Sequence, residues 1–237
     1  RVEQALQGRT SGVAVAANSG APGAASTVRV RGITTLNGND PLYVVDGVIV
    51  NGGIDFLNQS DIESIEVLKD AASAAIYGTR GAAGVILVTT KKGKEGAIRI
   101  NYNGYYGTQA PARKLDLLNA TEYATLRNEA SVAGGGPIVY ADPRALGEGT
   151  DWQEYVFNDD ARIQNHDFSV SGGNGKSTYY ASYGYLNQEG IVATAISNYE
   201  RHNVRLNSTH KVKDWLTVGQ NLGYSHIKSK GGFNPNT

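Results

Sequence analysis

The sequence contains no cysteine and no methionine, and it has little proline, with 6 prolines in 237 residues. Without cysteine the chain has no disulfides, no thiolate metal ligands and no cysteine nucleophile. The lack of methionine predicts that the start residue is missing, as in a processed or truncated protein. Net charge is also absent, because 22 basic and 22 acidic side chains balance. This balance argues against a nucleic-acid-binding protein and against a polybasic protein of the membrane surface.

Long hydrophobic runs are missing as well. No stretch approaches the roughly 18 consecutive apolar residues of a membrane-spanning helix, and no signal peptide is present. Membrane-spanning β-strands contain no such run, so the sequence does not exclude a β-barrel membrane protein. Charged residues make up 19% and hydrophobic residues 40% of the chain. Such a composition excludes a disordered chain, because disorder requires high charge and low hydrophobicity.

The aromatic residues are distributed unevenly. The chain has 14 Tyr, 4 Phe and 2 Trp, and only three of these side chains (Tyr43, Phe56, Tyr77) lie in the first hundred positions. The remaining 137 residues hold all the others. We therefore expect two regions of different fold, with a boundary near residue 97 and domains at 1–96 and 97–237.

The first region reads as a small α+β domain. β-Branched runs at 28–32, 42–50, 62–68 and 84–90 predict strands, and clusters of Gly, Asn, Pro and Ser separate them. The run at 62–68 is ambiguous between strand and helix, because short apolar runs suit both. Asp70 stands where it would cap a short Ala-rich helix that ends at Gly78.

The second region alternates apolar and polar residues with a period of two, which predicts long antiparallel strands. In 199–207, Val204 and Leu206 lie on the face opposite a wholly polar row. We expect strands at about 97–108, 164–172, 177–188, 199–211 and 215–229.

The predicted connections alternate in length. Short turns lie at 172–176 and 212–215, whereas the link from about 109 to 164 is long and carries a helix to about Ala130, opened by a capping box at Asn119 and Glu122. Short turns on one side and long loops on the other are typical of outer-membrane barrels. A soluble β-sandwich with one polar face is the alternative.

No catalytic, cofactor or metal motif stands out. The segment 172–178 ends like a P-loop, but Val170 occupies the position of the required first glycine. No G-x-S-x-G motif occurs, and the four histidines lack metal-ligand spacing. Asp159 and Asp160 lie outside any EF-hand pattern. We therefore expect a protein that is not an enzyme and that has no cofactor.

Residues 2–95 closely resemble the plug domain of TonB-dependent outer-membrane transporters, specifically the SusC/RagA family of the Bacteroidetes. The resemblance rests on ordered motifs such as Val-Arg-Val-Arg-Gly at 28–32, Pro-Leu-Tyr-Val-Val-Asp-Gly at 41–47 and the segments 62–78 and 81–86. Segments 114–123 and 179–190 also resemble the start of that family's barrel.

The resemblance implies an α+β plug domain followed by the first antiparallel strands of a transmembrane β-barrel, which in the parent has 22 strands. About five strands cannot close a barrel, so we expect the chain to be a portion of a larger protein. The implied function is TonB-dependent import of an oligosaccharide or oligopeptide across the bacterial outer membrane. A non-transporting outer-membrane or surface β-protein, such as an adhesin, is the alternative.

The resemblance also implies partners. These are a SusD-like surface lipoprotein, TonB with ExbB and ExbD from the inner membrane, the nutrient itself and outer-membrane lipid, with no nucleic acid. Arg31 and Arg80 match plug positions that tend to pair with barrel carboxylates in related transporters, and Glu66 and Lys69 are further candidates for such plug–barrel ion pairs. Ordinary solvated charges are the alternative.

Two further groups of residues are candidates for the transport path. Comparison with the family's topology predicts that the plug loops with Asn18, Ser19, Asn51, Asp55 and Asn58 face the substrate, although such loops also serve simply to turn the chain. Barrel topology predicts that Arg201, Asn203, Arg205 and Asn207 face the lumen.

Overall fold

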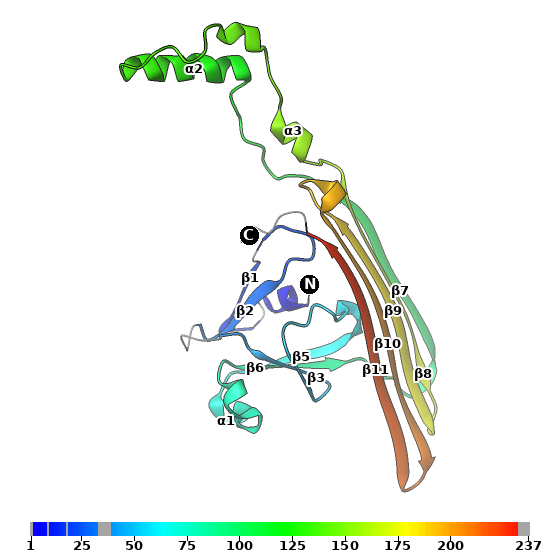
Figure 1. The fold of residues 1–237 in the computed structure, drawn as a ribbon. Helices are drawn as coiled ribbons and strands as arrows, with labels where there is room; N and C mark the ends of the chain where they lie inside the picture. The colour runs from blue at the N-terminus through cyan, green and yellow to red at the C-terminus, as the bar shows by residue number, and fades with distance from the viewer. Residues whose placement is uncertain (1, 9, 18, 33–38, 232–237) are drawn as a thin grey trace.

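The structure, a computed structural model, describes residues 2–8, 10–17, 19–32 and 39–231. An N-terminal region, residues 2–95, lies on the concave side of a curved five-stranded sheet (Figure 1). A long connection projects beyond one end of this sheet and carries a helix away from the rest of the molecule (Figure 1). Among the described residues, no helix has the length and hydropathy needed to cross a membrane.

The N-terminal region contains two small sheets. Strands β1 (Val13–Ala17) and β2 (Ser26–Val30) form an antiparallel pair. Strands β3 (Leu42–Val45), β4 (Val48–Val50), β5 (Ile62–Leu68) and β6 (Val85–Thr90) form a mixed sheet in the order β4-β3-β6-β5, in which β3 and β6 are parallel. The helical segments are η1 (Glu3–Leu6), η2 (Gln59–Asp61), α1 (Ala71–Ala74) and η3 (Ala75–Gly81).

Local structure corrects two of the predictions for this region. The run at 42–50 is not one strand but a hairpin, because Asp46 and Gly47 have φ angles of 49° and 85° and form a tight Asp-Gly turn. Asp70 precedes α1 but makes no capping bond with its side chain. Its carboxylate instead lies 2.6 Å from the guanidinium of Arg31, so the charge of Arg31 outcompetes the helix end. The ambiguous run at 62–68 is strand β5.

The core of the N-terminal region is assembled from distant segments. Helix η1, strands β2, β3 and β6 and the loop before η2 contribute buried apolar side chains to one cluster: Val2, Leu6, Val28, Tyr43, Val45, Ile54, Leu57, Ile86 and Val88. A smaller cluster of Leu42, Val44, Ala74 and Val85 packs β3 and β6 against α1. The N-terminal region thus has a hydrophobic core of its own, independent of the five-stranded sheet.

The five-stranded sheet is a simple antiparallel meander. Its strands are β7 (Gly96–Gln109), β8 (Ala161–Gly173), β9 (Ser177–Glu189), β10 (Asn198–Lys213) and β11 (Leu216–Lys230), and each pairs with the next strand in the chain. All five strands expected from the alternating pattern are present, with small differences at their ends. Short turns join β8 to β9 and β10 to β11, and η5 (Thr194–Ile196) lies between β9 and β10.

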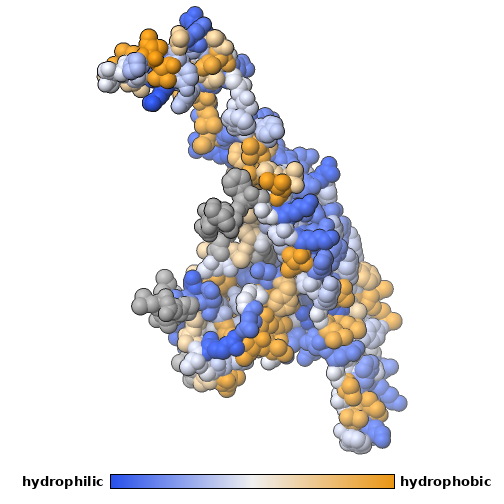
Figure 2. Space-filling model, in the orientation of Figure 1, coloured by the Kyte–Doolittle hydropathy of each residue, from blue (hydrophilic) through white to orange (hydrophobic). Residues whose placement is uncertain are grey.

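The long connection between β7 and β8 contains α2 (Ala120–Ala133), η4 (Pro143–Leu146) and α3 (Trp152–Val156). The capping box predicted at its start is confirmed: the Asn119 side chain accepts from the Glu122 N–H, and the Glu122 carboxylate accepts from the Asn119 N–H, both at 2.9 Å. Hydrophobic residues are visible on this connection and on the lower half of the sheet (Figure 2).

We predict that residues 1–96 fold alone and that Ile86→Ala lowers their unfolding free energy by about 2–5 kcal/mol. Ile86 is completely buried in the core, whereas Ile76 is 81% exposed. The matched control Ile76→Ala is therefore expected to stay within about 0.5 kcal/mol of wild type. Urea unfolding of the three purified proteins measures both values, and equal losses for both variants would contradict the assignment of the core.

Candidate functional site

The concave face of β10 is polar and contacts the N-terminal region. Arg201, Asn203, Arg205 and Asn207 occupy every second position of the strand, and all four side chains bond to residues between 46 and 91. Val204, on the opposite face, is 48% exposed. The period-two pattern of the strand therefore separates a face for the N-terminal region from a face for the surroundings.

A cluster of polar side chains, mostly buried but with Asn221 exposed, forms the centre of this contact. We call it the interface cluster, and it comprises Asp46, Asp61, Thr90, Tyr180, Arg205, Asn207 and Asn221. Asp46 stands in the β3–β4 turn, Asp61 ends η2, and Thr90 ends β6. The sheet supplies the other four from β9, β10 and β11. Three separate segments of the N-terminal region thus converge on three adjacent strands.

Arg205 is the charged centre of the interface cluster and is 7% exposed. Its guanidinium nitrogens lie 3.5 Å from Asp46 Oδ2 and 3.8 Å from Asp61 Oδ2, so two carboxylates of the N-terminal region surround one cation of the sheet. The same guanidinium donates to Thr90 Oγ1 at 3.1 Å and to Asn221 Oδ1 at 3.2 Å. Tyr180 donates to Asp61 Oδ1 at 2.9 Å. A buried arginine is tolerated here because several groups share its charge.

Asp46 is the most heavily bonded carboxylate of the interface cluster. It accepts from the Thr90 N–H at 2.9 Å, the Thr90 hydroxyl at 2.6 Å and the Asn221 amide at 2.7 Å. Burial by itself would raise the pKa of Asp46, but these hydrogen bonds and the Arg205 charge outweigh it and hold the pKa below its ordinary value. Asp46 is therefore a stable anion at neutral pH.

A second group of contacts joins the loop before η2 to the sheet. Asn58 donates to Asp167 Oδ1 of β8 at 2.5 Å, and Arg201 donates to the backbone oxygen of Asp55 at 2.5 Å. Asn203 donates to the backbone oxygen of Phe56. Gly184 of β9 leaves the space for Asn58, since a Cβ at Gly184 would lie 2.2 Å from Asn58 Nδ2. These bonds are directional, polar and individually weak.

A cleft of about 710 Å³ lies between this loop and the sheet. It lies beside the strand ends that lead into the long connection, and its lining is rich in amides, hydroxyls and tyrosines. The lining includes Ser19, Asp55, Asn58, Asn103, Tyr105, Gln109, Asn165, Asp167, Gln188, Tyr199 and Arg201. Such a surface offers hydrogen bonds of both kinds to a neutral, polar ligand.

The residues expected to form plug–barrel ion pairs contact their own region instead. Arg31 pairs with Asp70, Arg80 donates to Asn51 at 2.5 Å, and Lys69 donates to Ser11. Glu66 is exposed on β5. For these residues the plug–barrel pairing stays a prediction. Arg205 forms ion pairs across the interface with the reverse arrangement of charge, the cation being on the sheet and the carboxylates on the N-terminal region.

Only some of the residues expected to face a substrate line the cleft. Ser19, Asp55 and Asn58 line the cleft, whereas Asn51 bonds to Arg80 away from it. Asn18 lies outside the described residues. Sequence reasoning missed Asp46, Asp61 and Thr90, although the Asp-Gly pair at 46–47 is a strong hairpin signal that would have placed Asp46 in a turn.

We predict that Gly184→Ala displaces the loop at residues 55–61, because the added methyl group would overlap the amide of Asn58. The expected result is faster proteolytic cleavage in this loop and a lower melting temperature. Gly219→Ala is the matched control, since a Cβ at Gly219 meets its nearest atom at an ordinary 3.7 Å. Equal protection of the loop in both variants would contradict the close approach of Asn58 to β9.

We predict that acid weakens the contact through Asp46. Because its pKa is lower in the folded than in the unfolded protein, Asp46 stabilises the fold above its ordinary pKa of about 3.9. That stabilisation is lost as the pH falls from there through the lowered pKa. Asp46→Asn is therefore expected to flatten the fall of melting temperature with acid, and Asn221→Ala to flatten it in part. An unchanged slope in Asp46→Asn would refute this role.

Comparison with known proteins agrees with the geometry. The family model of the TonB-dependent receptor plug domain matches residues 1–85. TonB-dependent receptor P26 of Formosa agariphila is 41% identical over 98% of this chain, and TonB-dependent receptor SusC of Bacteroides thetaiotaomicron is 38% identical over 85% of it. The chain spans 24% and 20% of the lengths of these two relatives.

The solved structures agree as well. The RagAB peptide importer in its closed-closed state superposes with a TM-score of 0.81 and 31% identity, over 97% of this chain and 29% of that one. The match covers both the N-terminal region and the five-stranded sheet. The arrangement of these two parts relative to each other is therefore similar in the two proteins. The chain is a member of the SusC/RagA family of TonB-dependent receptors and consists of the plug domain and the first antiparallel strands of the barrel wall.

Proposed function

We propose that the parent protein imports a nutrient across the bacterial outer membrane in a TonB-dependent manner, with the plug gating the barrel. The observation that carries this proposal is a separately folded domain seated on the concave face of a barrel wall through polar, reversible contacts. A wide barrel without a plug would leak. A plug held by a continuous apolar interface would resist the movement that import needs, whereas hydrogen bonds can exchange for water.

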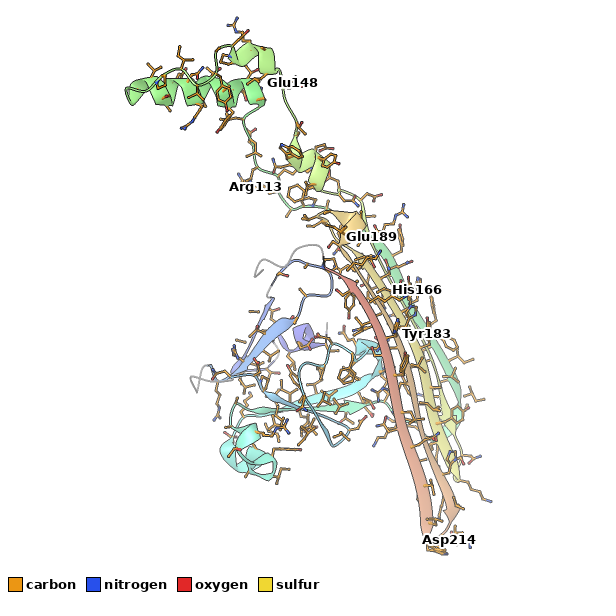
Figure 3. All side chains as sticks on the ribbon, in the orientation of Figure 1. Arg113, Glu148, His166, Tyr183, Glu189 and Asp214 are labelled. Atoms are coloured by element: carbon orange, nitrogen blue, oxygen red, sulfur yellow. The ribbon has the colours of Figure 1, made fainter. Side chains whose placement is uncertain are left out.

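The topology supports an orientation in the membrane. If the plug enters from the periplasm, β7 rises and the long connection with α2 lies outside the cell. The tight turns β8–β9 and β10–β11 then both lie on the periplasmic side, as in outer-membrane barrels, which have short periplasmic turns and long external loops. Figure 3 places Asp214 at one tip of the sheet and Glu148 on the long connection, beyond the other tip.

The partners follow from this proposal. The family name implies TonB, energised by ExbB and ExbD, which pulls from the inner membrane. A SusD-like surface lipoprotein would cover the external end of the barrel. The RagAB importer, which matches 97% of this chain over 29% of its own, is described in closed-closed and open-open states, consistent with a component that opens and closes.

The substrate class that we propose is an oligosaccharide or an oligopeptide. The cleft at the external end of the plug supports it, because its amides and hydroxyls suit a neutral polar chain. No cluster of metal-ligating side chains occurs in the part of the chain that the structure describes. The family consists of transporters, and we assign residues 1–96 to the plug and 97–237 to the beginning of the barrel.

A disulfide between plug and wall tests the gating role. A Cβ at Gly184 would lie 3.2 Å from Asn58 Cγ, so cysteines at positions 58 and 184 would have Cβ atoms within reach of a disulfide. Asn58→Cys also removes the amide that would clash, and this chain supplies no competing thiol. In the full-length protein, with its own cysteines replaced, the oxidised double variant is expected to stop nutrient-dependent growth, and dithiothreitol to restore it.

The matched controls carry one thiol each without the clash at position 184: Asn58→Cys alone, and Asn58→Ala combined with Gly184→Cys. Both are expected to grow in both redox states. Growth of the fully oxidised double variant would show that the plug can stay fixed to β9 during import. That result would overturn the gating proposal.

A further inference from the structure

The convex face of the sheet carries a row of histidines that the import function does not use. Gly104, His166, Tyr185, His202 and His226 stand side by side on β7 to β11, each paired in register with the next. We call these five positions the histidine row. Figure 3 shows His166 and Tyr183 on the side of the sheet away from the plug. Three of the four histidines of the chain lie in this row.

The three central rings of the histidine row, those of His166, Tyr185 and His202, contact one another in series, with the second pair tilted by 40°. His166 and Tyr185 are stacked with their ring centroids 6.4 Å apart, and Tyr185 and His202 follow at 5.0 Å. Tyrosines of the neighbouring row add hydrogen bonds: Tyr102 Oη lies 2.7 Å from His166 Nδ1, and Tyr183 Oη lies 2.8 Å from His202 Nδ1. With the hydroxyl as donor, each imidazole carries its proton on Nε2.

Gly104 makes this arrangement possible on β7. A Cβ at Gly104 would lie 2.6 Å from Tyr102 Oη and 3.1 Å from His166 Nδ1. The missing side chain lets the Tyr102 ring lie across the strand and reach His166, as aromatic residues do over strand glycines. The His166 imidazole is thus oriented by two tyrosines, Tyr102 and Tyr185. An incidental surface histidine does not need this degree of order.

The side chains on either side of the histidine row differ in character. Toward the short turns the same face is apolar and aromatic: Tyr102, Phe168, Tyr183, Val204 and Tyr224 form the next row, followed by Ile100, Val170, Ala181, Leu206 and Leu222. A tilted strand crosses the apolar part of a bilayer in about 9–11 residues, which suits the stretch of β10 between His202 and the turn at Asp214.

Away from the short turns the face becomes charged. Arg162, Lys228 and Lys230 are exposed there, and Glu189 and Glu200 are half-buried beside them. Glu200 lies 3.3 Å from His202 Nε2 and 3.9 Å from Lys228 Nζ, so it engages the middle of the row. These five side chains sum to one positive charge. Glu189 accepts from the Arg162 backbone N–H at 2.9 Å, so the cationic excess lies at β11, where His226 stands below the two lysines.

We propose that the histidine row and the cations above it bind the phosphate of a lipid headgroup at the boundary of the outer leaflet. This inference rests on the proposed function, because it requires the convex face to lie in a membrane. Lipid phosphates lie just outside the apolar layer, where the N–H groups of oriented imidazoles meet lysine and arginine side chains. Each cation at such a boundary adds roughly a fivefold preference for an anionic lipid.

A lipid fits this surface better than a metal or a soluble anion does. Tyr185 separates His166 from His202, and the described residues form no group of three side chains that could hold a metal ion. The donors lie directly beside apolar rows rather than in a closed pocket. The ligand must therefore present an anionic head and an apolar body together.

Native mass spectrometry of the full-length protein in detergent tests the proposal. The probes are dioleoyl phosphatidic acid and dioleoyl phosphatidylcholine, which share their acyl chains. We expect wild type to retain the phosphatidic acid about fivefold better, and Lys228→Gln with Lys230→Gln to lose this preference. His166→Phe with His226→Phe keeps the cations and is expected to weaken the retention of both lipids. His166→Gln with His226→Gln keeps an N–H donor at each position and is expected to keep most of that retention.

His210→Phe is the matched control, because His210 lies on the same face of β10 but near the opposite end of the strand. It is expected to behave like wild type, and inorganic phosphate is expected not to compete. No preference in wild type, an unchanged preference in the double lysine variant, unchanged lipid retention in the double Phe variant, an equal loss in His210→Phe, or full competition by inorganic phosphate would each overturn the proposal.

Failure of the lipid-binding proposal can be distinguished from failure of the import proposal. A protein that imports its nutrient but shows no lipid preference loses only the headgroup site. A protein that does not enter membranes at all loses both proposals.

Discussion

Arg205 is a cation removed from water, and the position of the plug depends on how its charge is balanced. Taking a guanidinium and two carboxylates out of water costs several kcal/mol per ion, and their attraction recovers this only if the geometry is good. The net stabilisation by such a cluster is therefore small, whereas a misplaced plug would leave a buried cation alone. The interface cluster thus favours one position of the plug without binding it tightly, which is compatible with the gating that we propose.

The remaining contacts of the interface are also individually weak. Asn58, Asn203 and Asn207 bond mainly to single oxygens, and each bond exchanges one water contact for one protein contact. The plug keeps its apolar side chains in its own core, so little hydrophobic area resists its release. Its stability and its attachment are consequently set by different residues, and a mutation can change one without changing the other.

Much of the fold could be predicted from the sequence because its signals are local. The alternation in β10 and the capping box at Asn119 each lie within a few residues, and the strands and helix they predict are present. The Asp-Gly turn at 46–47 was equally local and was overlooked within a β-branched run. The role of Asp70 was wrong because Arg31, 39 residues earlier, provides a stronger partner than a helix end.

The partners of Arg205 could not be predicted from local signals in the sequence. Asp46 lies 159 residues away, and no periodicity links a turn in one domain to a strand in another.

The meander of the wall has a consequence for assembly order. Each strand pairs with the one made just before it, and the plug precedes them all in the chain. The plug can therefore acquire its core before any wall exists, and the wall must then be wrapped around it. The strands β7 to β9 bring Asp167 and Tyr180 to the plug, but the charge balance is complete only when β10 and β11 arrive with Arg205 and Asn221. A wall of only three strands would therefore leave Asp46 and Asp61 of the plug without the cation that balances them.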